Sequence, residues 1–367
     1  MKMSKPAVPL VKVRMPPKDI LLPALEEVLY SGVVTEGDVV YRFEDEFSSH
    51  FNLANVLACS SGTGALHLAL LMCGVESGDH VITTAMTAEP TNTTILQAGA
   101  IPVFADVDPQ NGNLCPCSVE SLIDEKTRAI CVVHYAGYVA DLGRLREIAD
   151  KYGIALIEDC AHALGATWRG MPVGSIGDAA IFSFQAIKHM TTIDGGMLVL
   201  KDSTLADEAR LLRWFGLRKG VPRSEVDIKR AGFKYNMNNV TATIGIQQLR
   251  DIDVPLEQHI SNGLFFDQQF AMVPGVQPAR IHPATQSSYW LYTLLCDDSD
   301  AVERKLAEIG VTASKLHRPN HLHSVFAPFR RDLPQLEVFY RRMLHIPCGW
   351  WVSDIDRERI VEALRAC

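Results

Sequence analysis

Lys188 and Asp159 are the residues of this chain with the most specific chemistry. A lysine amine can condense with an aldehyde, and a carboxylate at the end of a buried strand needs a partner that offsets its lost hydration. Asp159 follows the apolar run 154–157, and Lys188 lies further along among apolar and hydroxyl residues. Together they would suit an aldehyde cofactor whose ring nitrogen the carboxylate keeps protonated. Each alone has an ordinary explanation, as a surface lysine or a helix-capping aspartate.

A candidate phosphate site lies at residues 60–64, which read Ser-Ser-Gly-Thr-Gly. The segment follows the apolar run 56–59 and precedes an apolar helical pattern. Backbone N–H groups at the start of a helix bind phosphate, which makes Gly62 and Thr63 candidate ligands, although the same turn can simply cap the helix. Ser183 lies shortly before the reactive lysine and could add a hydroxyl, or it could be satisfied by backbone at a strand end.

A second anion-binding candidate is the polar segment 232–239, which precedes a helical run at 240–249. Its asparagines can cap that helix, and Lys234 could supply positive charge to an anion. The occurrence of a lysine, a carboxylate and a phosphate turn in one α/β unit points to pyridoxal 5′-phosphate, which acts as an electron sink.

The composition is that of a globular protein with a sizeable core. The chain has 367 residues, 47% of them hydrophobic, and a formal net charge of −8, which argues against nucleic acid or an anionic membrane as the main partner. The sequence shows no signal peptide and no apolar run of the roughly 20 residues that a membrane helix needs. Its nine cysteines are scattered, which is typical of reduced thiols, so we predict a cytoplasmic protein.

Short apolar runs alternate with helical patterns along the first half of the chain. Strands that are apolar on both faces predict an α/β fold with a mostly parallel sheet covered by helices on both sides. The runs at 179–183 and 197–200 are too close together for a crossover helix, so we predict an antiparallel pair with Lys188 between its strands. The other predicted strands are 56–59, 81–83, 101–105, 129–133 and 154–157.

We predict two domains. Residues 1–252 would form an N-terminal arm and a large cofactor-binding domain, and residues 253–367 a smaller C-terminal α/β domain with a strand at 289–295 and a helix at 300–309. Residues 1–21 contain four prolines, which favours an arm outside the core.

The chain resembles the DegT/DnrJ/EryC1/StrS family of pyridoxal-phosphate enzymes, best known as nucleotide-sugar aminotransferases. The match runs along nearly the whole chain. The motifs that carry it are Ser31-Gly32 with Gly37 and Phe43-Glu44, residues 61–66 (Ser-Gly-Thr-Gly-Ala-Leu), 100–108, 134–137 and 158–166, and 177–184 followed by Lys188 and 194–196.

The resemblance implies a fold-type I aminotransferase-like homodimer with active sites shared between subunits. Lys188 would join the cofactor and carry the proton to and from the substrate carbon, and Asp159 would pair with the pyridine nitrogen. Gly62, Thr63 and Ser183 would hold the phosphate, with Lys234 assisting across the interface. An amino acid, usually glutamate in this family, would give its amino group to the keto group of a nucleotide-linked sugar.

Four positions depart from the family pattern. His162 stands where glutamine is usual, close to the cofactor ring, and is either a cofactor contact or a core histidine. Ala88 stands where relatives often have an aromatic ring stacked on the cofactor. Lys234 and Asn236 lie in a segment in which relatives commonly carry arginine, which changes anion recognition there. Substrate contacts are predicted from residues 31–34, 87–92, Tyr235 and 317–323.

Several other functions are compatible with parts of this sequence. One branch of the family has histidine in place of the lysine and deoxygenates sugars, and Lys188 argues against it. Amination of a keto-cyclitol or an aromatic acid, and a non-catalytic regulator with the same fold, stay open. The alternation of strands and helices would also fit a dinucleotide-dependent dehydrogenase, but the Gly-x-Gly-x-x-Gly motif of those enzymes does not follow the first predicted strand. His321 and His323 have a metal-ligand spacing, but nothing nearby completes a site, so we predict no metal.

Overall fold

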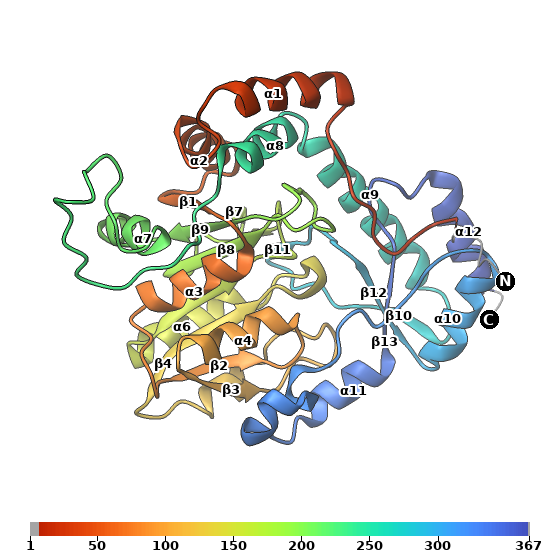
Figure 1. The fold of residues 1–367 in the computed structure, drawn as a ribbon. Helices are drawn as coiled ribbons and strands as arrows, with labels where there is room; N and C mark the ends of the chain where they lie inside the picture. The colour runs from red at the N-terminus through yellow and green to blue at the C-terminus, as the bar shows by residue number, and fades with distance from the viewer. Residues whose placement is uncertain (1–6, 366–367) are drawn as a thin grey trace.

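The computed structural model describes residues 7–365 and has a seven-stranded sheet at its centre (Figure 1). The strand order is β1-β9-β8-β5-β4-β2-β3, and β9 alone runs antiparallel to its neighbours. The predicted large, mostly parallel sheet and the antiparallel pair around Lys188 are therefore confirmed. The strands are β1 (Val56–Cys59), β2 (His80–Thr84), β3 (Ile101–Ala105), β4 (Thr127–Val133), β5 (Ala155–Asp159), β8 (Ala179–Ser183) and β9 (Gly196–Leu200).

Helices cover both faces of this sheet. Consecutive strand residues point to opposite faces, so Leu156 packs in the hydrophobic cluster on one side and Ile157 in the cluster on the other. Helices α2 (Asp38–Phe51), α6 (Leu142–Tyr152) and α8 (Asn239–Leu249) cover the first side, and α3 (Gly62–Met72), α4 (Glu89–Gln97) and α7 (Ala206–Arg213) the second. Helix α1 (Lys18–Tyr30) lies along α8 (Figure 1). The short helix α5 (Pro116–Glu120) contacts α6.

The C-terminal part is built around a three-stranded antiparallel sheet in the order β10-β12-β13. Its elements are α9 (Asp253–Phe270), β10 (Val276–Pro278), β12 (Tyr292–Cys296), α10 (Ser299–Glu308), α11 (Pro334–Arg342), β13 (Met343–Ile346) and α12 (Asp354–Arg365). A third small sheet joins β11 (Thr285–Gln286) to β6 (Thr167–Trp168) and β7 (Met171–Pro172), and short 3₁₀ turns occupy 135–137, 203–205, 320–322 and 324–329. The predicted boundary at residue 252 falls where α9 begins, and the division into domains stays a prediction.

The strand predicted at 289–295 begins three residues later, at Tyr292. Residues 287–291 instead follow the turn at 135–137, where the Leu291 N–H donates to the Ala136 carbonyl at 3.2 Å. Gly137 permits this close approach, because a Cβ there would lie 2.7 Å from the Trp290 nitrogen. Trp290 therefore sits in a bend before the strand.

The N-terminal segment is more deeply packed than its proline content predicted. Val8 and Leu10 are buried, Val8 forms a bridge with Val311, and the Trp351 indole N–H donates to the Pro9 carbonyl at 2.8 Å. The expectation that the arm stays outside the core is wrong here, because apolar side chains alternate with its prolines. For residues 1–6 the prediction concerns positions outside the part of the chain that the structure describes.

Within residues 7–365, no helix has both the length and the apolar character that crossing a membrane requires.

A buried ion-pair network ties α7 to the sheet. Arg213 is 1% exposed and donates to Glu44 at 2.6 Å, to the Ala58 carbonyl at 2.7 Å and to Glu36 at 2.8 Å.

An Arg213→Met variant leaves the two carboxylates buried without this cation, so we expect the free energy of unfolding to fall by about 3–5 kcal/mol in a denaturant titration. The control Arg210→Met, which removes a half-exposed partner of Glu44, should cost less than about 1 kcal/mol. Equal losses in the two variants would contradict this prediction.

Candidate active site

A cavity of about 350 Å³ opens at the carboxyl ends of the parallel strands. Ligands in open α/β sheets usually bind at this edge. The structure brings seven of the eight predicted site residues to this cavity, and Lys234 is not among its lining residues. The seven are Gly62, Thr63, Ala88, Asp159, His162, Ser183 and Lys188.

Lys188 lies on the excursion between β8 and β9, and its backbone N–H donates to the Gln185 carbonyl at 3.0 Å. Its amino nitrogen lies 4.0 Å from the centroid of the Trp290 ring. Burial lowers the pKa of Lys188 to about 7, and the nearby Asp159 carboxylate opposes this shift. A substantial share of the amine is therefore neutral, and so nucleophilic, near neutral pH.

Asp159 is the last residue of β5 and is 4% exposed. It accepts hydrogen bonds from the Thr91 hydroxyl at 2.8 Å and from the Ala161 backbone N–H at 3.1 Å. Burial raises the pKa of Asp159, although these donors and Lys188 lower it in part. A carboxylate whose burial is this costly would be stabilised by a cationic ring nitrogen, so the site fits a protonated pyridine.

The N-terminus of α3 and the end of β8 form a cradle for an anion. The Ser61 side chain accepts from the Gly64 N–H at 3.0 Å, and the N–H groups of Gly62 and Thr63 have no acceptor within the helix. A Cβ on Gly62 would lie 3.0 Å from the Cβ of Ser183, so glycine lets the helix approach the strand. Backbone donors and two hydroxyls at a positive helix end are the groups that suit a phosphate.

Two histidine rings, His162 and His317, line the cavity beside Lys188, and the Trp290 ring lies next to them. His162 is stacked on Trp290, with centroids 4.0 Å apart and planes at 18°, and lies parallel to His317 at 5.6 Å. The Ala136 N–H donates to His162 Nδ1 at 3.4 Å, which places the proton of the neutral ring on Nε2. Burial and the Lys188 charge hold the pKa of His162 well below its usual range. At position 88 the methyl group of alanine lines the cavity, so no aromatic ring stacks there.

His317 belongs to the tract 317–323, in which the sequence predicts substrate contacts. Its Nε2 is buried and has no hydrogen-bond partner, and its ring faces the cavity. Burial lowers the pKa of His317 to about 4, with a smaller contribution from Lys188. His321 and His323 do not line the cavity, and His323 lies 3.6 Å from the Glu89 carboxylate.

Lys234 lies apart from this cavity. Its amino group donates to Asn236 at 2.9 Å and lies 3.8 Å from the Trp214 ring centroid. Tyr235 in the same segment bonds to His67 Nδ1 at 3.0 Å.

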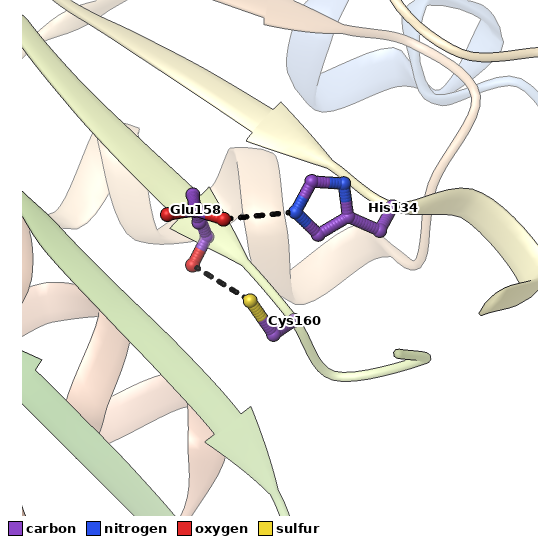
Figure 2. Close-up of side chains that lie close together, drawn as sticks. All are labelled: His134, Glu158 and Cys160. Atoms are coloured by element: carbon purple, nitrogen blue, oxygen red, sulfur yellow. Dashed lines mark hydrogen bonds and ion pairs between the residues drawn. The ribbon is translucent and has the colours of Figure 1, made fainter. Parts of the chain in front are cut away.

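Glu158, which precedes Asp159 in β5, has a structural role. Glu158 is fully buried and accepts a hydrogen bond from His134 at 3.2 Å (Figure 2). Its two oxygens also accept from the backbone N–H groups of Gly174, Ile176 and Gly177 at 2.9, 3.0 and 2.6 Å. Burial raises the pKa of Glu158, but His134 and the backbone donors outweigh it, and the net shift is downward. Cys160 completes a group of metal-binding residue types, with its thiol against the Glu158 carbonyl. Because protein donors already occupy both oxygens, Glu158 holds the turn before β8.

Two site residues were not recognised from the sequence. Thr91 was placed among the substrate contacts at 87–92, but its bond to Asp159 joins two different strand–helix units, which spacing cannot reveal. The sequence places Trp290 only within the strand predicted at 289–295. Its position beside Lys188 depends on the bend at 287–291, which that prediction does not contain.

Comparison with known proteins agrees with this geometry. The model of the DegT/DnrJ/EryC1/StrS aminotransferase family matches residues 18–365. The chain is 32% identical to the spore coat polysaccharide biosynthesis protein SpsC of Bacillus subtilis over 357 residues, which covers 92% of each protein. It is also 32% identical to GDP-perosamine synthase of Caulobacter vibrioides over 355 residues, with coverage of 95% of this chain and 94% of that protein.

Solved structures show the same fold. The sugar aminotransferase CalS13 from Micromonospora echinospora superposes on this chain with a TM-score of 0.94 and is 35% identical in sequence. The superposition covers 98% of this chain and 99% of the CalS13 chain. The PLP form of Spr1654 from Streptococcus pneumoniae, described as a sugar aminotransferase, superposes with a TM-score of 0.89 at 26% identity over 97% and 98% of the two chains. This chain is therefore an aminotransferase and belongs to the DegT/DnrJ/EryC1/StrS family, whose members depend on pyridoxal phosphate.

Proposed function

We propose that this aminotransferase uses pyridoxal 5′-phosphate to move an amino group from an amino acid, in the first place L-glutamate, to the keto group of a nucleotide-linked keto-deoxysugar for amino-sugar biosynthesis. The observation that carries the proposal is the convergence of Lys188, Asp159 and the start of α3 on one cavity. The sugar is supported by relatives named GDP-perosamine synthase and sugar aminotransferase.

Each residue then has a defined task. When bound, the cofactor supplies an aldehyde for attachment of an amine and a ring that takes up electrons. Gly62, Thr63 and Ser183 bind its phosphate, and Asp159 keeps the ring nitrogen protonated. Lys188 would remove a proton from the carbon of the amino donor and, in the second half of the reaction, deliver a proton to the former keto carbon of the acceptor, a task for which a pKa of about 7 suits a base at neutral pH.

The cavity wall suits the neutral, hydroxyl-rich sugar ring of such an acceptor. Among the described residues that line it, Lys188 is the only lysine or arginine. His162 and His317 are neutral at pH 7 because burial lowers the pKa of both. The unpartnered Nε2 of His317 can exchange a hydrogen bond with a sugar hydroxyl, which acts as both donor and acceptor.

The remaining parts of the proposal concern assembly and location. We propose a cytoplasmic homodimer in which Lys234 of a second copy adds positive charge to the site. Such a charge would bind the cofactor phosphate or the carboxylate of the amino donor, for which this cavity holds no free cation among its described lining residues.

A two-stage spectroscopic experiment tests the function. Purified protein incubated with pyridoxal phosphate should gain a visible absorption band, and borohydride reduction followed by peptide mass spectrometry should place the cofactor on Lys188. L-Glutamate should bleach the band, and a nucleotide-linked keto-sugar should restore it. Restoration by a keto-cyclitol or a keto-precursor of an aromatic acid, with none by any keto-sugar, would overturn the proposed acceptor. A protein that never gains the band would overturn the proposed cofactor.

A further inference from the structure

The Lys188 amino group lies against the face of the Trp290 indole, 4.0 Å from the ring centroid. Trp290 comes from the bend at 287–291, far from Lys188 in sequence, and is 2% exposed. The amino group and the indole face are therefore in direct contact.

Trp290 is fixed in place from several directions. Its indole N–H donates to the carbonyl of Ile187, the residue before Lys188, at 2.8 Å. The bend that carries it is held by the bond of Leu291 to Ala136 and by a 3.0 Å contact between His189 Nε2 and the Ser288 carbonyl. The ring and the backbone of the lysine are thus connected directly, and the ring cannot turn without breaking a buried hydrogen bond.

An indole face attracts an ammonium group, and more strongly when water is excluded. The titratable groups that lie near enough to feel the charge of Lys188 are Asp159, His162, His189 and His317. Burial lowers the pKa of all three histidines, so they are neutral at pH 7 and add no positive charge that would repel the ammonium. Asp159 and the Trp290 face are the groups that favour a proton on Lys188, whereas burial disfavours it.

We propose that Trp290 is a positioning residue for Lys188, whose indole face receives the amino group when it is released from the cofactor and stabilises the proton that it carries. The proposal rests on the proposed function, in which Lys188 takes up a proton from one substrate carbon and delivers it to another atom. A lysine held against a flat ring keeps one location while it is protonated and stays within reach of the reacting carbon. Trp290 acts through the lysine and need not touch the substrate.

The test measures proton affinity in the cofactor-free protein and needs no substrate. Acetic anhydride labels neutral amines, and peptide mass spectrometry after labelling between pH 5 and 10 gives the pH at which half of Lys188 reacts. Removal of the indole in Trp290→Leu should lower this midpoint by about one pH unit, because the ammonium loses its ring partner. Trp290→Phe keeps a ring with a weaker face and should give a smaller shift in the same direction.

The sign of the shift separates this role from simple packing. If Trp290 only fills space, Trp290→Leu admits water, relieves the burial of Lys188 and raises the midpoint. An unchanged or raised midpoint in Trp290→Leu, or a drop in Trp290→Phe as large as in Trp290→Leu, overturns the proposal.

A matched control uses another tryptophan face that carries a lysine, away from the cavity. Lys12 lies 5.0 Å from the Trp350 ring centroid, so Trp350→Leu removes a similar contact elsewhere and should leave the Lys188 midpoint unchanged. A shift in this control would overturn the assignment to Trp290. Because the measurement uses neither cofactor nor sugar, it can succeed even if no keto-sugar is accepted, in which case only the proposed function fails.

Discussion

A Lys188→Ala variant is expected to lose amino transfer by about 10⁴-fold or more, because it removes the group that attaches the cofactor and moves the substrate proton. The variant should still bind pyridoxal phosphate through the α3 cradle and Asp159, but borohydride should no longer fix the cofactor to the chain. Transfer is measured from L-glutamate to a nucleotide-linked keto-sugar, and cofactor retention by absorption after gel filtration.

Two controls make the Lys188→Ala result specific. Lys201→Ala changes an exposed lysine at the end of β9 and should leave both readouts as in the unchanged protein. A small amine such as methylamine, added to Lys188→Ala, should restore part of the activity by acting as a free base in the emptied space. Activity within tenfold of the unchanged protein, without added amine, would show that another group carries the proton.

The second large effect is expected from Asp159→Asn. The amide cannot supply the charge that holds a proton on the pyridine nitrogen, and the loss of one charge-assisted hydrogen bond corresponds to about a 100-fold fall in amino transfer. Cofactor affinity should fall with it, which fluorescence titration of the cofactor-free protein measures. Without cofactor, Asp159→Asn should be at least as stable as the unchanged protein, because burial raises the pKa of Asp159 and its charge is costly at neutral pH.

Glu158→Gln provides the contrasting control. The net shift of the Glu158 pKa is downward, so its charge stabilises the fold above the pKa of the unfolded chain, and this contribution is lost as pH falls. Thermal unfolding at pH 7 should therefore occur at a lower temperature in Glu158→Gln, whether or not the cofactor is present. If Asp159→Asn destabilised the cofactor-free protein as much as Glu158→Gln, the division of roles between the two acids would be wrong.

The sequence predicted those parts of the site that lie on contiguous motifs. The predicted residues lie at the ends of strands or in the turns that come next: Gly62, Thr63, Asp159, Ser183 and Lys188. Because the carboxyl ends of parallel strands lie at the same edge of the sheet, the sequence was enough to predict that these residues come together. The variants described above test the role of each.

The parts that were missed depend on contacts between distant segments. Trp290 reaches Lys188 only because Gly137 allows the turn at 135–137 to approach the backbone of residues 287–291 closely. The apolar and aromatic residues at 289–295 predict a strand whether or not this turn lies beside them. The same limitation applies to Thr91, which meets Asp159 from the start of α4. Periodicity fixes the face on which a side chain lies but not its partner on another element.

Glu158 and Asp159 divide their work because adjacent residues of a strand face opposite sides of the sheet. Glu158 belongs to the side of α6, where it holds the turn at 174–177, and Asp159 to the side of α3, where Lys188 lies. A one-residue slip or deletion within β5 would exchange the two acids and turn a fold anchor toward the cofactor. The roles of the two acids therefore depend on the register of β5. A redesigned protein, or another protein into which the site is transferred, must keep both acids and also the number of strand residues that precede them.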